Sequence, residues 1–292
     1  MSTFERTQRE DPSSFAADRG LRVLALCADD FGQNPGISAG IARLAHVQRL
    51  TAISCITNSP HWPQQAKRLQ GLPATVDVGL HLNFTEGKPL SARLARRWPT
   101  LPALPTLIAR AHLRWLPQAE MRNEVHAQLR AFIHAHGQPP RFIDGHQHVH
   151  HLPGLRETIL DMAEHVQPLP ALRSTARVLG PGFGFKRWMI ERTGGRALAG
   201  ALRQRVFAHN PALLGAYDFV DADYGGLMRR WLKALPAEGG LLFCHPGAHE
   251  PDDPPDAIAA ARAREFAYLA SGDFGNDLQQ AGVVLGRVWK TA

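Results

Sequence analysis

Short apolar runs alternate with longer amphipathic stretches along this chain. Turn-forming residues such as Gly, Pro and Asp bound the short runs, as expected of β-strands. Between these runs, apolar residues recur at helical spacing. This alternation is typical of βα units arranged around a mainly parallel sheet. The predicted strands are 21–28, 51–57, 76–82, 141–150, 172–177 and 241–245, with 282–285 as a weaker candidate, and the predicted helices are 37–48, 121–136 and 256–271.

Two stretches, 88–118 and 180–214, interrupt this alternation. The first is rich in proline and basic residues, and the second mixes glycine, aromatic residues and arginine. We expect both to be insertions, which either cover the mouth of the fold as loops or decorate its surface. The chain has 292 residues, a length within the range of one α/β barrel, so the sequence predicts a single large domain.

Residues 1–20 are polar and charged, and we expect them to form a flexible N-terminal extension. They lack the apolar segment of a secretion signal, and no apolar stretch approaches the length of a transmembrane helix. The sequence therefore predicts a cytoplasmic protein without a transmembrane segment. Lys and Arg number 33 against 26 Asp and Glu, but the basic residues are scattered, so we predict no nucleic-acid partner.

Three familiar kinds of site are absent from the sequence pattern. Cys27, Cys55 and Cys244 each lie in an apolar run and are too widely spaced for a disulfide framework or a CxxC metal site. We therefore predict that they are small buried residues. The DFG string at 30–32 lacks the other motifs of a kinase, and no GxSxG elbow marks a serine nucleophile.

Polar side chains stand where several apolar runs end. Asp29 and Asp30 close the first predicted strand, His81 lies near the end of the third, and His245 ends another. The carboxyl ends of parallel strands are where α/β barrels build their sites. Adjacent residues at a strand end point in different directions, so one of the two aspartates could bind a metal while the other faces a bound water. Pro246 and Gly247 predict a turn that could hold His245 toward the mouth, where it could donate a proton.

A string of histidines follows Asp144. On an extended backbone, Asp144, His146, His148 and His150 would share one face, because side chains alternate with a period of two. A row of imidazoles beside a carboxylate suits a borderline divalent metal. A pH sensor or a surface histidine tract is the alternative interpretation of the same string.

Four of these motifs together resemble those of the YdjC-like (ChbG/HpnK) carbohydrate deacetylases, in the same order and at about the same spacing. The resemblance covers residues 21 to about 287. It implies a deformed (β/α) barrel of the glycoside hydrolase/deacetylase type, a single domain over 21–292 with the two insertions. The motifs are ADDFG followed by NPGISAGIARL, VGLHLNFTEGKPL, FIDGHQHVHHLPGL and FCHPG.

The resemblance also implies a set of roles. Asp30, His81 and His146 would bind one divalent metal ion, zinc or magnesium first, with cobalt, nickel or manganese as alternatives. Asp29 would be the general base and His245 the general acid. The implied reaction removes an acetyl group from an N-acetylated oligosaccharide or glycolipid.

Further residues are candidates for contact with the substrate. They are Arg173, His148, His150 and Asn83, and Arg173 could instead pair with Asp29. Asp144 is a candidate to orient His146 through its other ring nitrogen. The segment 250–255 departs from the family pattern, because acidic and proline residues replace a tyrosine-containing turn. Homodimerisation is a further option.

Two other functions remain open at this point. The same ligands could serve a metal-dependent hydrolase of O-acyl esters or phosphoesters. Alternatively, the barrel could bind sugars without catalysis.

Overall fold

The computed structural model describes residues 20–291, so the predicted N-terminal extension lies almost entirely outside the described residues. Strands and helices alternate along most of this range. The strands are β1 (Arg22–Phe31), β2 (Ala52–Cys55), β3 (Asp77–Leu82), β4 (Phe142–Gly145), β5 (Ala171–Leu172), β6 (Leu213–Leu214), β7 (Gly240–Cys244) and β8 (Val283–Leu285). The helices are α2 (Pro35–His46), α3 (Trp62–Gln65), η1 (Ala66–Leu69), α4 (Ala92–Arg97), α5 (Leu104–His112), α6 (Gln118–His136), η2 (His146–His151), α7 (Leu155–Ala163), α8 (Gly184–Ile190), η3 (Glu191–Gly195), α9 (Arg196–Gln204), α10 (Tyr224–Ala234), α11 (Ala259–Ala270) and α12 (Gly272–Gln280).

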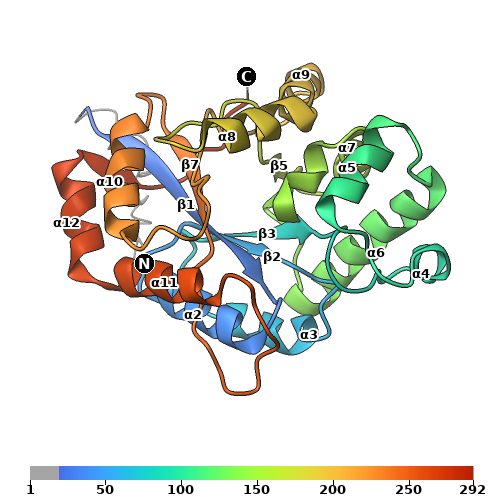
Figure 1. The fold of residues 1–292 in the computed structure, drawn as a ribbon, viewed down its shortest axis with the longest axis horizontal. Coiled ribbons are helices and arrows are strands. Elements are labelled where there is room, and N and C mark those ends of the chain that lie inside the picture. The colour runs from blue at the N-terminus through green and yellow to red at the C-terminus, as the bar shows by residue number, and fades with distance from the viewer. Residues whose placement is uncertain (1–19, 292) are drawn as a thin grey trace, which may run out of the picture.

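All strand pairs in the sheet are parallel, in the order β5-β4-β3-β2-β1-β7-β6. Leu24 in β1 pairs with both Gly240 in β7 and Leu285 in β8, so β8 lies on the edge of β1 opposite to β7. At the two ends of this order, isolated parallel bridges join Leu172 to His209 and Val178 to Leu213. The sheet therefore closes irregularly into a deformed (β/α) barrel, as predicted. Its helices surround it, with α10 to α12 on one side and α4 to α7 on the other (Figure 1).

β1 is buried on both faces, which explains its continuous apolar sequence. Leu24, Leu26 and Ala28 belong to the large core that also includes helix residues, whereas Ala25 and Cys27 belong to a second cluster inside the barrel. Because side chains alternate along a strand, Asp29 continues the inward-facing series of Ala25 and Cys27. The strand thus delivers a carboxylate to the interior of the barrel at its carboxyl end.

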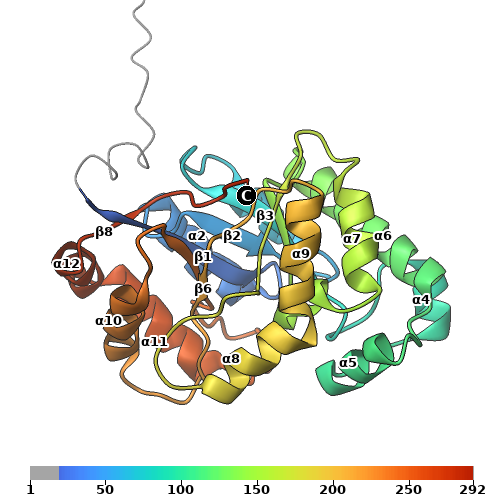
Figure 2. The same cartoon turned by 90° about the horizontal axis from the view of Figure 1, so that it is seen from above.

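The two stretches expected to be insertions contain regular structure. Residues 88–118 form α4 and α5, and residues 180–214 form α8, η3, α9 and also β6. We did not predict β6, because a strand of two residues is too short to show an alternating pattern. α5 and α8 both lie along the lower edge of the molecule in Figure 2. None of the helices in the described range is long and apolar enough to span a bilayer.

Candidate active site

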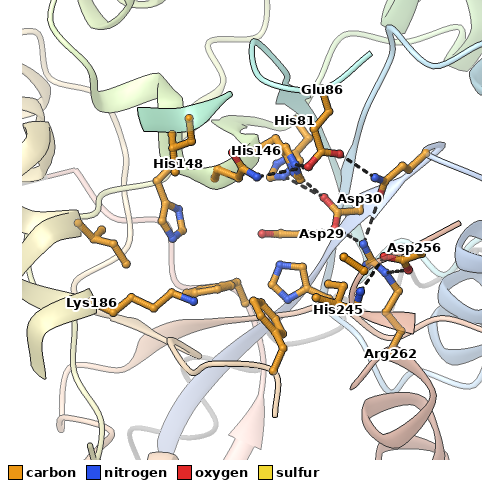
Figure 3. Close-up of a pocket in the computed structure, with 18 of the residues that line it drawn as sticks. Asp29, Asp30, His81, Glu86, His146, His148, Lys186, His245, Asp256 and Arg262 are labelled. Atoms are coloured by element: carbon orange, nitrogen blue, oxygen red, sulfur yellow. Dashed lines mark hydrogen bonds and ion pairs between the residues drawn. The ribbon is translucent and has the colours of Figure 1, made fainter. Parts of the chain in front are cut away.

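A cavity of about 680 Å³ opens at the carboxyl ends of the central strands. Its inner end is polar and includes Asp29, Asp30, His81, His146 and His245 (Figure 3). The outer wall is more apolar, with α5 and α8 among the elements that form it. Leu104 and Ile108 of α5 and Met189 and Ile190 of α8 line that wall. The cavity is therefore large enough for a small substrate and lies where α/β barrels place their sites.

An irregularity at the end of β1 brings two adjacent carboxylates to this cavity. The pairing of β1 with β2 shifts register between Ala28 and Phe31, and Asp30 has a φ of 69°. A positive φ is unfavourable for a residue with a side chain and is typically found at functional sites. The break in alternation lets both Asp29 and Asp30 line the cavity, although they are neighbours in the sequence.

Asp30, His81 and His146 form a buried cluster whose ligand atoms all lie within 4.8 Å of one another. Nδ1 of His146 lies 2.8 Å from Oδ1 of Asp30, and Nε2 of His81 lies 3.5 Å from the same oxygen. Two imidazoles and one carboxylate that converge on one point are the donor set of a catalytic zinc-type site, with coordination positions left open. The cluster thus fits one divalent metal ion.

The acidic and basic groups around this cluster favour each other's charged forms. Burial by itself would raise the pKa of Asp30, but His146 and Arg262 hold that pKa well below its usual range. Burial would likewise lower the pKa of His146, yet Asp30 and Glu86 raise it to about 10. Nη2 of Arg262 lies 2.8 Å from Oδ2 of Asp30, and its Nε lies 2.7 Å from Asp256. Arg262 therefore occupies the oxygen of Asp30 that the histidines do not face.

Asp144 lies behind His81. Its Oδ1 lies 2.6 Å from Nδ1 of His81 and accepts a hydrogen bond from Ser54, and its Oδ2 lies 2.5 Å from Nη2 of Arg173. Although burial disfavours the charge, Arg173 and His81 lower the pKa of Asp144 to about 2. Such a carboxylate fixes the ring orientation and the tautomer of a metal-binding histidine. The prediction that Asp144 orients His146 is wrong, because its carboxylate contacts His81.

Asp29 forms a two-point ion pair with Arg173. Nη1 and Nη2 of Arg173 donate hydrogen bonds of 2.7 Å and 2.6 Å to the two carboxylate oxygens. Burial alone would lower the pKa of Arg173, but Asp144 and Asp29 raise it well above its usual range. The predicted pairing of Arg173 with Asp29 is thus confirmed. Arg173 is fully buried and does not line the cavity, so it acts through these carboxylates.

His245 follows β7 and lines the cavity between the rings of Phe219 and Phe243, whose centroids lie 5.0 Å and 5.7 Å from its own. Its backbone N–H donates to Oε2 of Glu265, while its buried Nδ1 has no hydrogen-bond partner among the described residues. Burial lowers the pKa of His245 to about 4, despite the opposing effect of Asp30 and Asp29. The ring is therefore neutral at neutral pH, and one nitrogen is available to a ligand.

The histidine string does not continue as a strand. β4 ends at Gly145, and residues His146–His151 form a tight turn in which Gln147 and His148 have φ of 52° and 62°. The prediction of an extended backbone to 150, with alternate side chains on one face, is wrong for this segment, because left-handed residues break the alternation. A Cβ on Gly145 would lie 2.9 Å from the backbone nitrogen of His150, so the glycine permits this close turn.

As a result, the candidate substrate-binding residues separate into two groups. His148 lines the cavity, whereas His150 is buried and its Nε2 lies 2.9 Å from the carbonyl oxygen of Arg173. Asn83 is buried too, and its side chain bonds to the turn that follows β3. Neither His150 nor Asn83 lines the cavity, so both contribute to its framework.

The structure also adds residues that the sequence analysis did not name. Glu86, Lys186, Asp256 and Arg262 all line the cavity. Glu86 lies within the motif that contains His81, and this was the one available sequence indication. Arg262 lies in a helix with one other arginine, Arg264, and nothing in the sequence distinguished the two.

Comparisons with known proteins agree with this architecture. A family model described as YdjC-like protein matches residues 23–280. The chain is 31% identical to a carbohydrate deacetylase of Xenopus laevis over 140 residues, which cover 46% of this chain and 45% of that protein. It is 33% identical to a chitooligosaccharide deacetylase of Proteus mirabilis (strain HI4320) over 135 residues, which cover 44% of this chain and 50% of that protein. These two matches span about half the length of the relatives.

A longer match and a solved structure extend the similarity to nearly the whole chain. A carbohydrate deacetylase of Mus musculus is 29% identical over 298 aligned positions, which cover 90% of this chain and 92% of that protein. A crystal structure from Enterococcus faecalis V583, described as a candidate cellobiose-phosphate cleavage protein, superposes with a TM-score of 0.68 at 20% identity. That superposition covers 92% of this chain and 98% of the other, and it supports the fold alone.

Proposed function

Because the chain belongs to the YdjC-like protein family, we propose that it is a carbohydrate deacetylase, which hydrolyses the acetamide of an N-acetylated sugar with one divalent metal ion. The convergence of Asp30, His81 and His146 beside Asp29 on one cavity wall carries this proposal. The names of the relatives, carbohydrate deacetylase and chitooligosaccharide deacetylase, support the choice of substrate class.

Asp30, His81 and His146 would hold the metal ion. When bound, a divalent ion supplies Lewis acidity, which polarises an amide carbonyl and acidifies water. Zinc, cobalt, nickel or manganese suit a site with two imidazoles better than magnesium, which prefers an all-oxygen set. The oxygen of Asp30 that faces Arg262 stays engaged with the guanidinium, so the other oxygen is the one presented beside the histidines.

Asp29 would take the proton from the attacking water. Arg173 fixes both of its oxygens in a fork geometry, which sets the orientation of the carboxylate and leaves lone pairs free on the cavity side.

His245 would deliver a proton to the departing amine. Its ring lines the cavity, and its buried Nδ1 has no hydrogen-bond partner among the described residues, so no such group competes with the substrate for that nitrogen. The imidazole is neutral in this structure, so it would first take up a proton from solvent, and negative charge developing on the carbonyl oxygen during attack would favour this uptake. The proton taken from the water would stay on Asp29 until the products leave. Proton donation at this point allows the C–N bond to break with an amine as the leaving group.

A covalent acyl intermediate on cysteine is not part of this proposal. Burial raises the pKa of the thiols of Cys27, Cys55 and Cys244 well above the usual range. The reactive thiolate is therefore disfavoured at all three positions. Direct attack by water suits the site better.

The outer wall of the cavity suits the remainder of the substrate. An acetamide could bind at the polar inner end while the rest of an oligosaccharide or glycolipid extends along the apolar wall formed by α5 and α8. Ligand pockets combine such apolar walls with a few polar groups that fix the orientation of the ligand.

The test is acetate release from a panel of N-acetylated sugars. Protein stripped with a chelator should be inactive, zinc or cobalt should restore acetate release, and Asp29→Asn should lower it at least 100-fold. Asp161→Asn is the matched control, because Asp161 also pairs with an arginine, Arg205, but on the surface. Release of phosphate or of an alcohol from an O-acyl ester in place of acetate would favour the other hydrolase functions, and sugar binding without turnover in any metal would refute catalysis.

A further inference from the structure

Glu86 lies in the turn after β3, with 44% of its side chain exposed on the cavity wall. Its Oε1 lies 3.1 Å from Nε2 of His146, an ion-pair contact without the linear geometry of a hydrogen bond. The other nitrogen of His146, Nδ1, lies 2.8 Å from Asp30. His146 therefore stands between Asp30 and Glu86 (Figure 3).

The same arrangement occurs at His81. One nitrogen of His81 faces Asp30 at 3.5 Å, and the other lies 2.6 Å from Asp144. Each imidazole thus directs one nitrogen to the same oxygen of Asp30 and the other to a second carboxylate. A carboxylate behind a metal-binding histidine fixes its ring orientation and increases its basicity. Asp144 has this position for His81 through a hydrogen bond of 2.6 Å, and Glu86 has it for His146 through the ion pair of 3.1 Å.

Glu86 is held in place by two side-chain amides. Nε2 of Gln33 donates to its Oε2 at 3.1 Å, and Nε2 of Gln147 donates to its Oε1 at 3.3 Å. A half-exposed glutamate on a turn would otherwise sample several rotamers, because such side chains lose considerable entropy when they are ordered. The two amides reduce this freedom and aim the carboxylate at His146.

The backbone of Glu86 is also held in place, by hydrogen bonds to two asparagine side chains. Nδ2 of Asn83 donates to the carbonyl oxygen of Glu86 at 2.9 Å, and Nδ2 of Asn58 donates to it at 3.4 Å. Oδ1 of Asn83 accepts hydrogen bonds from the backbone N–H groups of Thr85 and Glu86. Asn83 thus closes an Asx turn that sets the direction of the chain at Glu86.

We propose that Glu86 is a positioning residue of the metal site, which fixes His146 through its outer nitrogen, and that Asn83 acts by holding Glu86. The proposal rests on the metal site of the proposed function. Among the described residues, the cluster of ligand atoms within 4.8 Å comprises Asp30, His81 and His146. Glu86 therefore acts through His146 and does not itself bind the ion.

The test measures metal binding without any substrate. Co²⁺ is titrated into the chelator-treated full-length protein, and both the dissociation constant and the visible absorption spectrum of the bound ion are recorded. Glu86→Gln should weaken Co²⁺ binding 10- to 100-fold, as is typical when such a partner is lost, and shift the spectrum. Glu157→Gln is the matched control, because Glu157 is 49% exposed and pairs with Arg156 and the backbone N–H of Gly154 instead of with a metal-binding histidine. It should bind Co²⁺ like the parent protein.

A double-mutant cycle tests the part played by Asn83. Asn83→Ala should weaken Co²⁺ binding when Glu86 is present and have little further effect in Glu86→Gln, because both changes remove one contact. Additive losses of Co²⁺ affinity in the double variant would overturn the role of Asn83. If Asn83→Ala fails to fold, the Glu86→Gln result still tests the role of Glu86.

Several outcomes would overturn the proposal for Glu86. Unchanged affinity and spectrum in Glu86→Gln would do so, and unchanged metal binding with reduced acetate release would place Glu86 on the substrate. If the parent protein binds neither Co²⁺ nor Zn²⁺, the metal part of the proposed function fails with it. If the parent binds metal but releases no acetate, only the proposed reaction fails.

Discussion

Asp29 and Arg173 meet through two hydrogen bonds of 2.7 Å and 2.6 Å, although 143 residues separate them in the chain. The same guanidinium contacts Asp144, which in turn contacts His81. One buried arginine therefore links the candidate general base to the metal-binding histidines.

Replacing Arg173 with lysine should separate its positive charge from its role in orienting Asp29. A single ammonium group cannot reproduce a fork that contacts two carboxylates, so the orientation of Asp29 is lost while the charge remains. We expect Arg173→Lys to lower kcat about 100-fold with a smaller change in KM, as measured by acetate release. Arg177→Lys is the control, because Arg177 pairs with Glu238 on the surface and should keep its rate. Parent-like kcat in Arg173→Lys would contradict this role.

Asp144→Asn should weaken metal binding, because the carboxylate that fixes His81 loses its charge. We expect a 10- to 100-fold increase in the dissociation constant for Zn²⁺ by calorimetric titration. The free energy of unfolding should also fall by about 3 kcal/mol, since Arg173 loses a buried partner. Asp77→Asn changes a buried aspartate at the other end of β3, which bonds to Trp289 and Arg287, and should leave Zn²⁺ affinity unchanged. Equal Zn²⁺ affinities in the parent protein, Asp144→Asn and Asp77→Asn would exclude Asp144 from the metal site.

Stability should depend on pH through Glu265. Burial raises the pKa of Glu265 to about 7, although hydrogen bonds from Tyr217 and the backbone of His245 oppose this effect. In the unfolded chain the carboxyl titrates near 4.5, so between pH 4.5 and 7 the folded state retains a proton that the unfolded state has lost. The contribution of protonated Glu265 to the free energy of unfolding is present in full below pH 4.5 and is lost as the pH rises through 7.

Glu265→Gln removes this titration, so its free energy of unfolding should vary less across that pH window. The difference in the free energy of unfolding between the two proteins should change by up to about 3 kcal/mol across this window, because a pKa raised from 4.5 to about 7 favours the protonated folded state by that amount. Urea unfolding at pH 5, 6, 7 and 8 measures it. Parallel pH profiles for the parent and Glu265→Gln would show that Glu265 does not titrate in this range.

His148 and His150 should respond differently to substitution. His148 lines the cavity, and its Nδ1 has no hydrogen-bond partner in the described part of the chain, so His148→Ala should raise KM for an N-acetylated sugar about 10-fold with little loss of stability. His150 supports the carbonyl of Arg173, so His150→Ala should lower the free energy of unfolding by about 1–3 kcal/mol. Steady-state kinetics and urea unfolding on both variants separate the two roles. A larger KM effect in His150→Ala than in His148→Ala would reverse the assignment.

The sequence by itself determined the fold class and the main candidate residues. Apolar runs that end in Asp30, His81 and His245 predict one site, because the carboxyl ends of parallel strands meet at one end of a barrel. These are local patterns, and a periodicity of two or 3.6 residues is readable without knowledge of the partner strands.

Only the tertiary structure decided which residues support that site. His81 and Asp144 contact each other because β3 and β4 pair in a register that places them side by side, and a shift of one residue would separate them. Left-handed residues after Gly145 turn the histidine string away from the strand, so His146 and His148 reach the cavity while His150 does not. Arg262 approaches Asp30 across 232 residues of sequence. Such contacts depend on strand register, turn conformation and helix docking, which are set by the packing of distant segments and leave no periodic trace in the sequence.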